Sequence, residues 1–217
     1  TASMNNDINN MEKFANYYDD LNAFGLTMCP PCINRSEVKF SVSEDKILFG
    51  LGAIKNVGYE SMSKIVENRK ENGNFIDIYD FAKRVHLKKV GKRPLEMLIS
   101  SGAFADFKYE DSAMLDKVEE LILYSAACHD EEGSDQVNLF SNSIETIKKP
   151  EFKSLAPLSR SLKSKAIYDV TGIHFMSPFK YKPNFYESLG IKKFGALLET
   201  TTEFQSIITA GFITNLT

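Results

Sequence analysis

Apolar residues recur at helical spacing through most of the first 130 residues. The first stripe predicts a helix over residues 4–24, which ends at Gly25, a residue that commonly terminates helices. The same spacing predicts further helices up to Asn72, over 77–85, from Pro94 to Ser100, over 112–129 and over 158–168. Helices therefore make up most of the predicted structure.

A change of period to two marks a small region of β structure after the first predicted helix. Residues 38–42 alternate between apolar and polar, residues 43–46 form a polar turn, and residues 47–49 return as a second strand. We therefore expect a mainly α protein with a small β-hairpin, in the α+β class.

Two tight, glycine-bearing connections separate successive helices. Residues 50–60 indicate a short apolar helix or turn followed by a hairpin, in which Gly58 is expected to supply a positive φ angle. A second tight connection covers residues 88–93, and the two units lie about 35 residues apart. This degenerate repeat predicts a tandem helix-hairpin-helix module.

The second connection is strongly basic. Six bases and no acids fall within residues 83–93: Lys83, Arg84, Lys88, Lys89, Lys92 and Arg93. Backbone N–H groups at a helix start, with bases beside them, bind phosphate without reading base sequence. The candidate DNA-binding residues are Lys55, Asn56, Val57, Gly58, Lys88, Lys89, Gly91, Lys92 and Arg93. The alternative is two solvated loops between packed helices.

The stretch that follows the predicted helices is acidic and polar. Nine acids and one lysine occur over residues 110–135, and residues 131–153 are predicted to be an exposed linker. This linker contains one apolar island, whose residues Gln136, Val137, Leu139 and Phe140 indicate a docking peptide. Alternatively, Leu139 and Phe140 pack onto this protein's own core.

Composition restricts the classes of function. Apolar residues make up 43% and the net charge is −3, so nucleic-acid binding must come from a local patch. No apolar run is long enough to cross a bilayer and no signal peptide is evident, which favours the cytoplasm and no membrane partner. The start on Thr1 and the strand-like run over 207–217 indicate a fragment of a longer protein.

The cysteines and histidines give little support for catalysis or metal binding. The spacing of Cys29 and Cys32 is typical of redox sites and of half a zinc site, but the pair leads into a β-hairpin. The other Cys/His pair, Cys128 with His129, lies about a hundred residues away. We expect structural cysteines, no metal site and no self-sufficient catalytic site. A thiol oxidoreductase, with a depressed thiol pKa, remains an alternative.

Several specific stretches resemble the C-family of bacterial replicative polymerases, the DNA polymerase III alpha subunits. Residues 2–7 match an A-S-M-x-x-D stretch of the family, and residues 30–34 match a P-P-x-I-N step. Residues 49–58 match an F-G-L-G-A-I-K-x-V-G segment, and residues 92–104 match a basic K-R-x-L-E-x-L-I-x-S-G-A-F block. The chain departs from the family at Cys32, where an acid is usual, and at Asn56, the first residue of a usual Gly-Val-Gly. Asparagine tolerates the left-handed conformation, so the turn is expected to survive.

The resemblance implies a division of the chain into parts. Residues 1–29 would be the end of the fingers region, and residues 30–130 the tandem helix-hairpin-helix and clamp-binding domain. Residues 131–153 would be a linker with the clamp-binding motif, residues 154–206 a connector, and residues 207–217 the first strand of an OB domain.

The resemblance also implies a function. Gln136 to Phe140 match the family's motif for the β sliding clamp, and the hairpins would hold duplex primer-template DNA beside other holoenzyme subunits. The parent chain would be a DNA-directed DNA polymerase whose Mg²⁺ is held by palm carboxylates outside this segment. The segment itself would carry no catalytic residue and no cofactor, and would be inactive alone. A stand-alone helix-hairpin-helix repair protein is the alternative.

Overall fold

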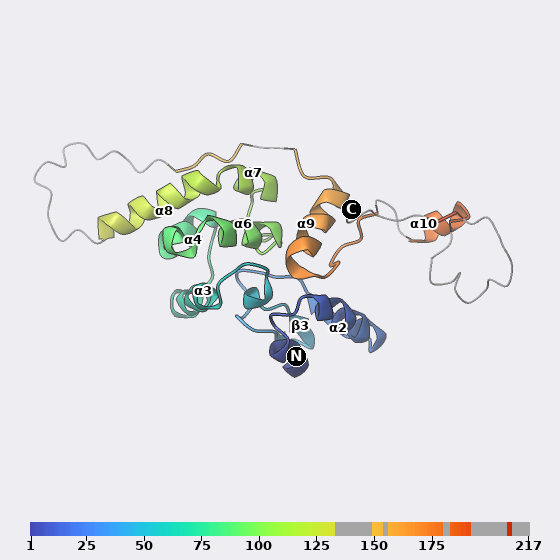
Figure 1. Ribbon diagram of the computed structural model, residues 1–217. Coiled ribbons are helices and arrows are strands. Elements are labelled where there is room, and N and C mark those ends of the chain that lie inside the picture. Colours follow the sequence, from blue (N-terminus) through green and yellow to red (C-terminus); the bar gives the residue numbers. More distant parts are fainter. Residues whose placement is uncertain (133–148, 154–155, 180–182, 192–207, 210–217) are drawn as a thin grey trace, which may run out of the picture.

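Helices make up most of the molecule, and three short strands form its one small sheet within the part that is described. The computed structural model describes residues 1–132, 149–153, 156–179, 183–191 and 208–209 (Figure 1). The helices are α1 (Ala2–Asn6), α2 (Glu12–Ala23), α3 (Tyr59–Asn72), α4 (Ile78–Arg84), α5 (Leu87–Val90), α6 (Lys92–Ser100), α7 (Asp111–Asp116), α8 (Val118–Glu132), α9 (Arg160–Thr171) and α10 (Pro183–Ser188). The strands are β1 (Thr27–Cys29), β2 (Ser41–Ser43) and β3 (Lys46–Leu48), and a short 3₁₀ helix, η1, spans Leu51–Ala53.

The centre of the fold is the group of helices from α3 to α8. Figure 1 shows α8 lying along α4 and α6, while the sheet, α1 and α2 occupy the end of the molecule nearest the N-terminus. Phe81 is completely buried and meets the rings of Phe75 and Phe104 edge-on, with centroids 5.1 and 5.0 Å away. Phe81 is an apolar position of the helix predicted over 77–85, so its burial is confirmed, whereas Phe75 and Phe104 lie outside the helices and were not indicated by the helical spacing.

Asp77 explains why α4 begins where it does. Its side chain accepts hydrogen bonds from the backbone N–H groups of Tyr79 and Asp80, at 2.9 and 2.7 Å. An aspartate in this position satisfies donors that the helix leaves unpaired and stabilises the helix by about 1 kcal/mol. The predicted helix over 77–85 therefore exists, with Asp77 as its cap.

The sheet has one more strand than the sequence predicts. β2 and β3 form the expected antiparallel hairpin, turning at Glu44 and Asp45, which both have positive φ angles. β1 pairs in parallel with β3, with Met28 opposite Ile47, which makes a mixed sheet of order β1-β3-β2. The predicted hairpin is therefore confirmed, and β1 is a third strand that the sequence did not predict. Three residues without alternation give no periodic signal for β1.

The first predicted strand also starts later than expected. The backbone N–H of Phe40 donates to Asn5 Oδ1 at 2.8 Å, and Asn5 Nδ2 donates to the Phe40 carbonyl at 3.0 Å. Because this side chain satisfies the Phe40 backbone, residues 38–40 lie outside the sheet and β2 begins at Ser41.

Two predicted helices are each interrupted. The helix over 4–24 is divided into α1 and α2, because Asp7 draws the intervening turn together by accepting from Lys13 Nζ at 2.7 Å and from Tyr17 Oη at 2.5 Å. The helix over 112–129 is divided into α7 and α8 at Lys117, which leaves helical geometry with φ −109°. Local side-chain bonding of this kind is not visible in an apolar stripe.

A buried arginine joins α3 to the loop that follows β1. The Arg69 side chain is only 7% exposed, and its guanidinium donates to the carbonyls of Ile33 and Ser36 at 2.8 and 2.7 Å. It also donates to Glu37 Oε1 at 3.3 Å. A buried charge is tolerated only when it is fully bonded, so these acceptors fix the loop against the helix.

The later part of the chain returns to this core at two places. Tyr79 Oη donates to the Pro150 carbonyl at 2.6 Å, and the Phe152 ring lies 4.5 Å from the Tyr109 ring, so residues 150–152 pack on the helical core. The predicted helix over 158–168 corresponds to α9, capped by Ser159. The predicted strand over 207–217 lies outside the described residues, apart from Ile208 and Thr209.

Candidate nucleic-acid interface

The first candidate hairpin lies between η1 and α3. Ile54 is buried, whereas Lys55, Asn56 and Gly58 are exposed on the loop that leads into α3. The positive φ of this turn belongs to Asn56, at 59°, as the resemblance allowed. The prediction that Gly58 supplies it is wrong: Gly58 has φ −81° and is the residue before the first turn of α3.

The backbone of this hairpin is anchored on its inner side. The Lys55 N–H donates to the Val170 carbonyl near the end of α9 at 2.9 Å, so the connector holds the loop from behind. No side chain caps the start of α3. The first-turn N–H groups of α3 are therefore free of side-chain competition, which is the arrangement that an anion needs.

The second candidate hairpin lies between α5 and α6. Gly91 joins the two helices with φ 95° and ψ 155°, and α6 also starts without a side-chain cap. The prediction of a tight connection over residues 88–93 is too wide, because Lys88 and Lys89 belong to α5 and residues 92–93 belong to α6, which leaves Gly91 alone between the two helices. Leu87 explains this helix: its side chain is buried and its N–H donates to the buried Ser125 Oγ at 3.0 Å.

Glycine is required at one hairpin and not at the other, which gives a matched test. The backbone angles of Gly91 fall in a region that only glycine adopts easily, whereas a Cβ at Gly58 would meet nothing closer than Ser61 Oγ at 3.6 Å. We expect Gly91→Ala to reduce the free energy of unfolding by about 1–3 kcal/mol and Gly58→Ala to change it by less than about 0.5 kcal/mol. Urea unfolding measures both values. Equal stability of the two variants would contradict the assignment of strain to Gly91.

The structure divides the basic run into structural and available side chains. Arg84 is structural: its guanidinium stacks on the Phe75 ring at 4.3 Å and donates to the carbonyls of Gly73 and Asn68. It therefore closes the C-terminal end of α3. This bonding removes Arg84 from the set that could meet a phosphate.

Lys92 is also engaged within the protein. Its Nζ forms ion pairs with Glu119 on α8 and, at 4.0 Å, with Glu96 on α6. The hydrogen bond that Lys92 donates to Glu119 raises the pKa of the Lys92 ammonium. The acid-free stretch of sequence around Lys92 is therefore not acid-free in space.

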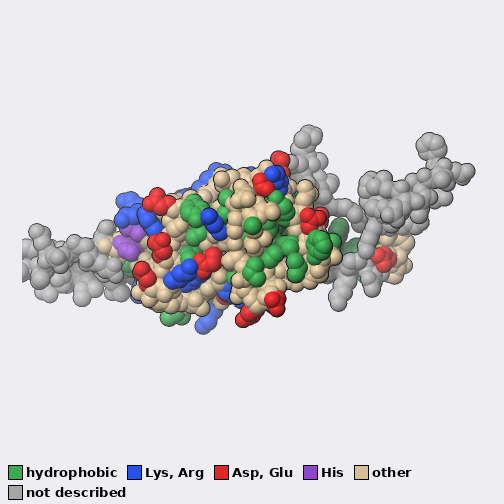
Figure 2. Space-filling view, turned by 90° about the horizontal axis from the view of Figure 1, so that it is seen from below, with side chains coloured by type: hydrophobic (Ala, Val, Ile, Leu, Met, Phe, Trp, Pro, Cys, Tyr) green, Lys and Arg blue, Asp and Glu red, His purple; other side chains and the backbone are tan. Residues whose placement is uncertain are grey.

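The remaining candidate bases are exposed and available. Lys55, Lys88, Lys89 and Arg93 form no ion pair with any residue that the structure describes. Figure 2 shows basic side chains gathered beside histidine side chains at one end of the molecule, with acidic side chains between them. A nucleic-acid interface on this chain has to be a local basic patch, because the net charge is −3.

The remaining sequence predictions concern other parts of the chain. Gln136, Val137, Leu139 and Phe140 lie outside the described residues. Within the described residues, no helix is long and apolar enough to span a membrane, and no three His, Cys, Asp or Glu side chains gather as a metal site would require.

The cysteines do not form a redox pair. Cys32 is buried and its thiol donates to Asp106 Oδ2 at 3.2 Å, while Cys29, on β1, is also a free thiol. Burial, together with the bond to Asp106, raises the pKa of the Cys32 thiol. A C-x-x-C redox site places its first cysteine at a helix N-terminus, whereas Cys29 lies on β1, so the geometry opposes the thiol oxidoreductase alternative.

The segment that contains the two hairpins is similar to known proteins. Residues 25–114, which contain both, match the helix-hairpin-helix motif family. The DNA polymerase III subunit alpha of Caulobacter vibrioides is 36% identical over 141 residues, or 65% of this chain and 12% of that protein. The subunit of Borreliella burgdorferi is 27% identical over 95% of this chain, and that of Buchnera aphidicola 29% over 99%, each covering 19% of the relative.

The chain therefore spans between about an eighth and a fifth of the length of these relatives. It is homologous to a segment of the bacterial DNA polymerase III alpha subunit, and it carries a helix-hairpin-helix motif.

Proposed function

We propose, on the premise of this homology, that the chain is the DNA-holding and clamp-docking segment of a replicative polymerase. The two hairpins act as a tandem helix-hairpin-helix module that grips duplex primer-template DNA through backbone phosphates. Nucleotidyl transfer and its Mg²⁺ chemistry belong to other parts of the polymerase in this proposal, and the segment contributes no catalytic residue or cofactor. Other holoenzyme subunits would assemble around it.

The observation that carries the proposal is the shared construction of the two hairpins. Each leads into a helix that starts without a side-chain cap, at Tyr59 or at Lys92, and each has exposed lysine or arginine side chains beside it. Amide groups and lysines contact phosphates and leave the base edges unread, so the binding is independent of sequence. A polymerase that moves along any template needs this property.

The clamp-docking part of the proposal rests on the sequence pattern of residues 136–140. The described residues on either side support it. α8 ends at Glu132, and the chain is packed on α4 and Tyr109 again by Pro150 and Phe152. A docking peptide attached to the core at both ends tethers the polymerase to a clamp. This tether raises the effective concentration of the polymerase at the primer terminus. The homology to polymerase subunits over nearly the whole chain favours this reading over a stand-alone repair protein.

Duplex binding by the 217-residue chain tests the DNA part. We expect binding to two unrelated duplexes of about two helical turns to agree within about threefold, because phosphate contacts carry no sequence information. With four available bases, the logarithm of the affinity should fall against the logarithm of salt concentration with a slope of about −3 to −4. Fluorescence anisotropy between about 50 and 200 mM salt measures this slope. Salt-independent binding, or strong preference for one sequence, would contradict the proposal.

A further inference from the structure

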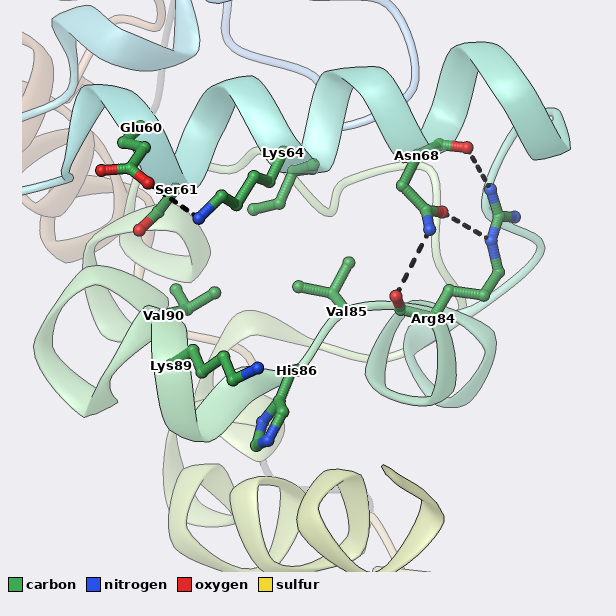
Figure 3. Close-up of a pocket in the computed structure, with 10 residues that line it drawn as sticks. Glu60, Ser61, Lys64, Asn68, Arg84, Val85, His86, Lys89 and Val90 are labelled. Atoms are coloured by element: carbon green, nitrogen blue, oxygen red, sulfur yellow. Dashed lines mark hydrogen bonds and ion pairs between the residues drawn. The ribbon is translucent and has the colours of Figure 1, made fainter. Parts of the chain in front are cut away.

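A groove lies between α3 and the segment that joins α4 to α5, with one end beside the two hairpins. It has a volume of about 350 Å³, within the range of roughly 300–1,000 Å³ that ligand pockets occupy. One wall is the first half of α3 and the other is the segment from Arg84 to Val90. Figure 3 shows Glu60 and Ser61 at the same end of the groove as Lys89 and Val90. That end therefore lies next to both Gly58 and Gly91.

The charge lining the groove is mainly positive. Its lining includes the three bases Lys64, Arg84 and Lys89 and a single carboxylate, that of Glu60. The far end is fixed, because Arg84 Nε donates to Asn68 Oδ1 at 2.9 Å and Asn68 Nδ2 donates back to the Arg84 carbonyl at 3.4 Å (Figure 3). The end beside the hairpins carries the two lysines, so an anion entering there meets ammonium groups from both walls.

One of these lysines already has an internal partner. Lys64 Nζ donates to Glu60 Oε1 at 2.8 Å, one helical turn away, and both side chains are largely exposed. This bond raises the pKa of Lys64 and lowers that of Glu60. Lys89 forms no ion pair with the residues that the structure describes. Glu60 is therefore the single negative charge that an anion would have to compete with in this groove.

We propose that this groove binds a backbone phosphate of duplex DNA between the two hairpins, through Lys64 and Lys89, and that Glu60 competes with that phosphate for Lys64. The proposal rests on the proposed function and extends it to Lys64 and Glu60, which the sequence did not single out. On binding, Lys64 exchanges the Glu60 carboxylate for the phosphate, and no covalent bond changes. Glu60 thus weakens the grip of the module on DNA.

Two substitutions with opposite expected signs test the exchange. Lys64→Ala removes one phosphate contact, so duplex affinity should fall about three- to tenfold and the salt slope should become shallower by about 1. Glu60→Gln removes the competitor and keeps the side-chain shape, so affinity should rise by a similar factor of about three to ten. Fluorescence anisotropy against labelled duplex, with salt as the variable, measures both.

Matched controls come from the other end of the same helix. Lys70→Ala and Glu71→Gln make the same two charge changes on exposed residues of α3, outside the groove. We expect neither to alter the salt slope. Because exposed ion pairs contribute little to folding, circular dichroism should show wild-type helix content in all four variants.

The outcomes separate this inference from the function on which it rests. Loss of affinity in Lys64→Ala together with a gain in Glu60→Gln, both absent from the controls, supports the exchange. Salt-dependent binding by the wild-type chain that Lys64→Ala leaves unchanged would overturn the groove site alone. A Glu60→Gln variant that binds no tighter than Glu71→Gln would overturn the role of Glu60. Absence of any salt-dependent binding by the wild-type chain would overturn the proposed function itself.

Discussion

Replacing Lys88, Lys89 and Arg93 with alanine is expected to weaken duplex binding about a hundredfold at physiological salt. The three side chains are exposed, lie on or next to the second hairpin, and form no ion pair with the described residues. Each phosphate contact releases counterions, so losing three contacts should also make the salt slope shallower by about 2.7. Anisotropy titration at several salt concentrations, on the whole chain, measures both quantities.

A control variant separates this effect from net charge. Lys13, Lys70 and Lys165 are each held in an ion pair and belong to neither hairpin, and replacing all three with alanine changes the formal charge by the same amount. We expect that variant to keep most of the wild-type affinity. Equal losses in the control and the hairpin variant would show that only bulk charge matters.

Lys92→Ala should have a smaller effect on duplex affinity than Arg93→Ala, because Glu119 already neutralises Lys92.

The second large effect is expected at the sliding clamp. Leu139→Ala combined with Phe140→Ala should reduce the affinity for the purified clamp at least about a hundredfold, because apolar anchors in a pocket dominate such interfaces. Duplex affinity should stay unchanged, since the hairpins are not altered. Isothermal titration calorimetry against the clamp measures the loss.

The spacer residue within the same motif provides the control. Asn138 is one of the two spacers before the proposed anchor Leu139, and we expect the Asn138→Ala variant to bind the clamp within about threefold of the wild-type chain, since most interface residues contribute little. Unchanged clamp affinity in the double variant would refute the docking role of residues 136–140. The DNA-holding part of the proposal would stand, because it depends on separate residues.

Most of the helical fold could be predicted because it depends on apolar spacing. α3, α4, α6 and α9 appear where the stripes indicate, and Phe81 is buried as expected. The errors arise where one polar side chain acts across the chain. The Asn5 side chain hydrogen-bonds the backbone of Phe40, 35 residues away, and β2 therefore starts later than the alternation predicts. Three-residue β1 gains its pairing only when β3 is beside it, so no local pattern could indicate it.

The candidate site was predictable in location but not in electrostatics. The two hairpins lie where glycine and basic residues indicate, and they fall within one family match. Their charges depend on tertiary neighbours: Glu119 reaches Lys92 from 27 residues away, and Arg84 is used at the end of α3. Lys64 was missed because it lies in the middle of a helix, and only the fold places it beside Lys89.

The hydrogen bond between the Lys55 N–H and the Val170 carbonyl has a consequence for communication along the chain. It joins the first hairpin to the end of α9, and Gly172 approaches Met11 so closely that a Cβ there would lie 2.5 Å from the Met11 side chain. The backbone of the first hairpin is therefore fixed against the end of α9. Thermodynamic linkage is reciprocal, so under the proposed function an event that displaces α9 would alter the affinity for DNA by the same free energy with which bound DNA opposes that displacement.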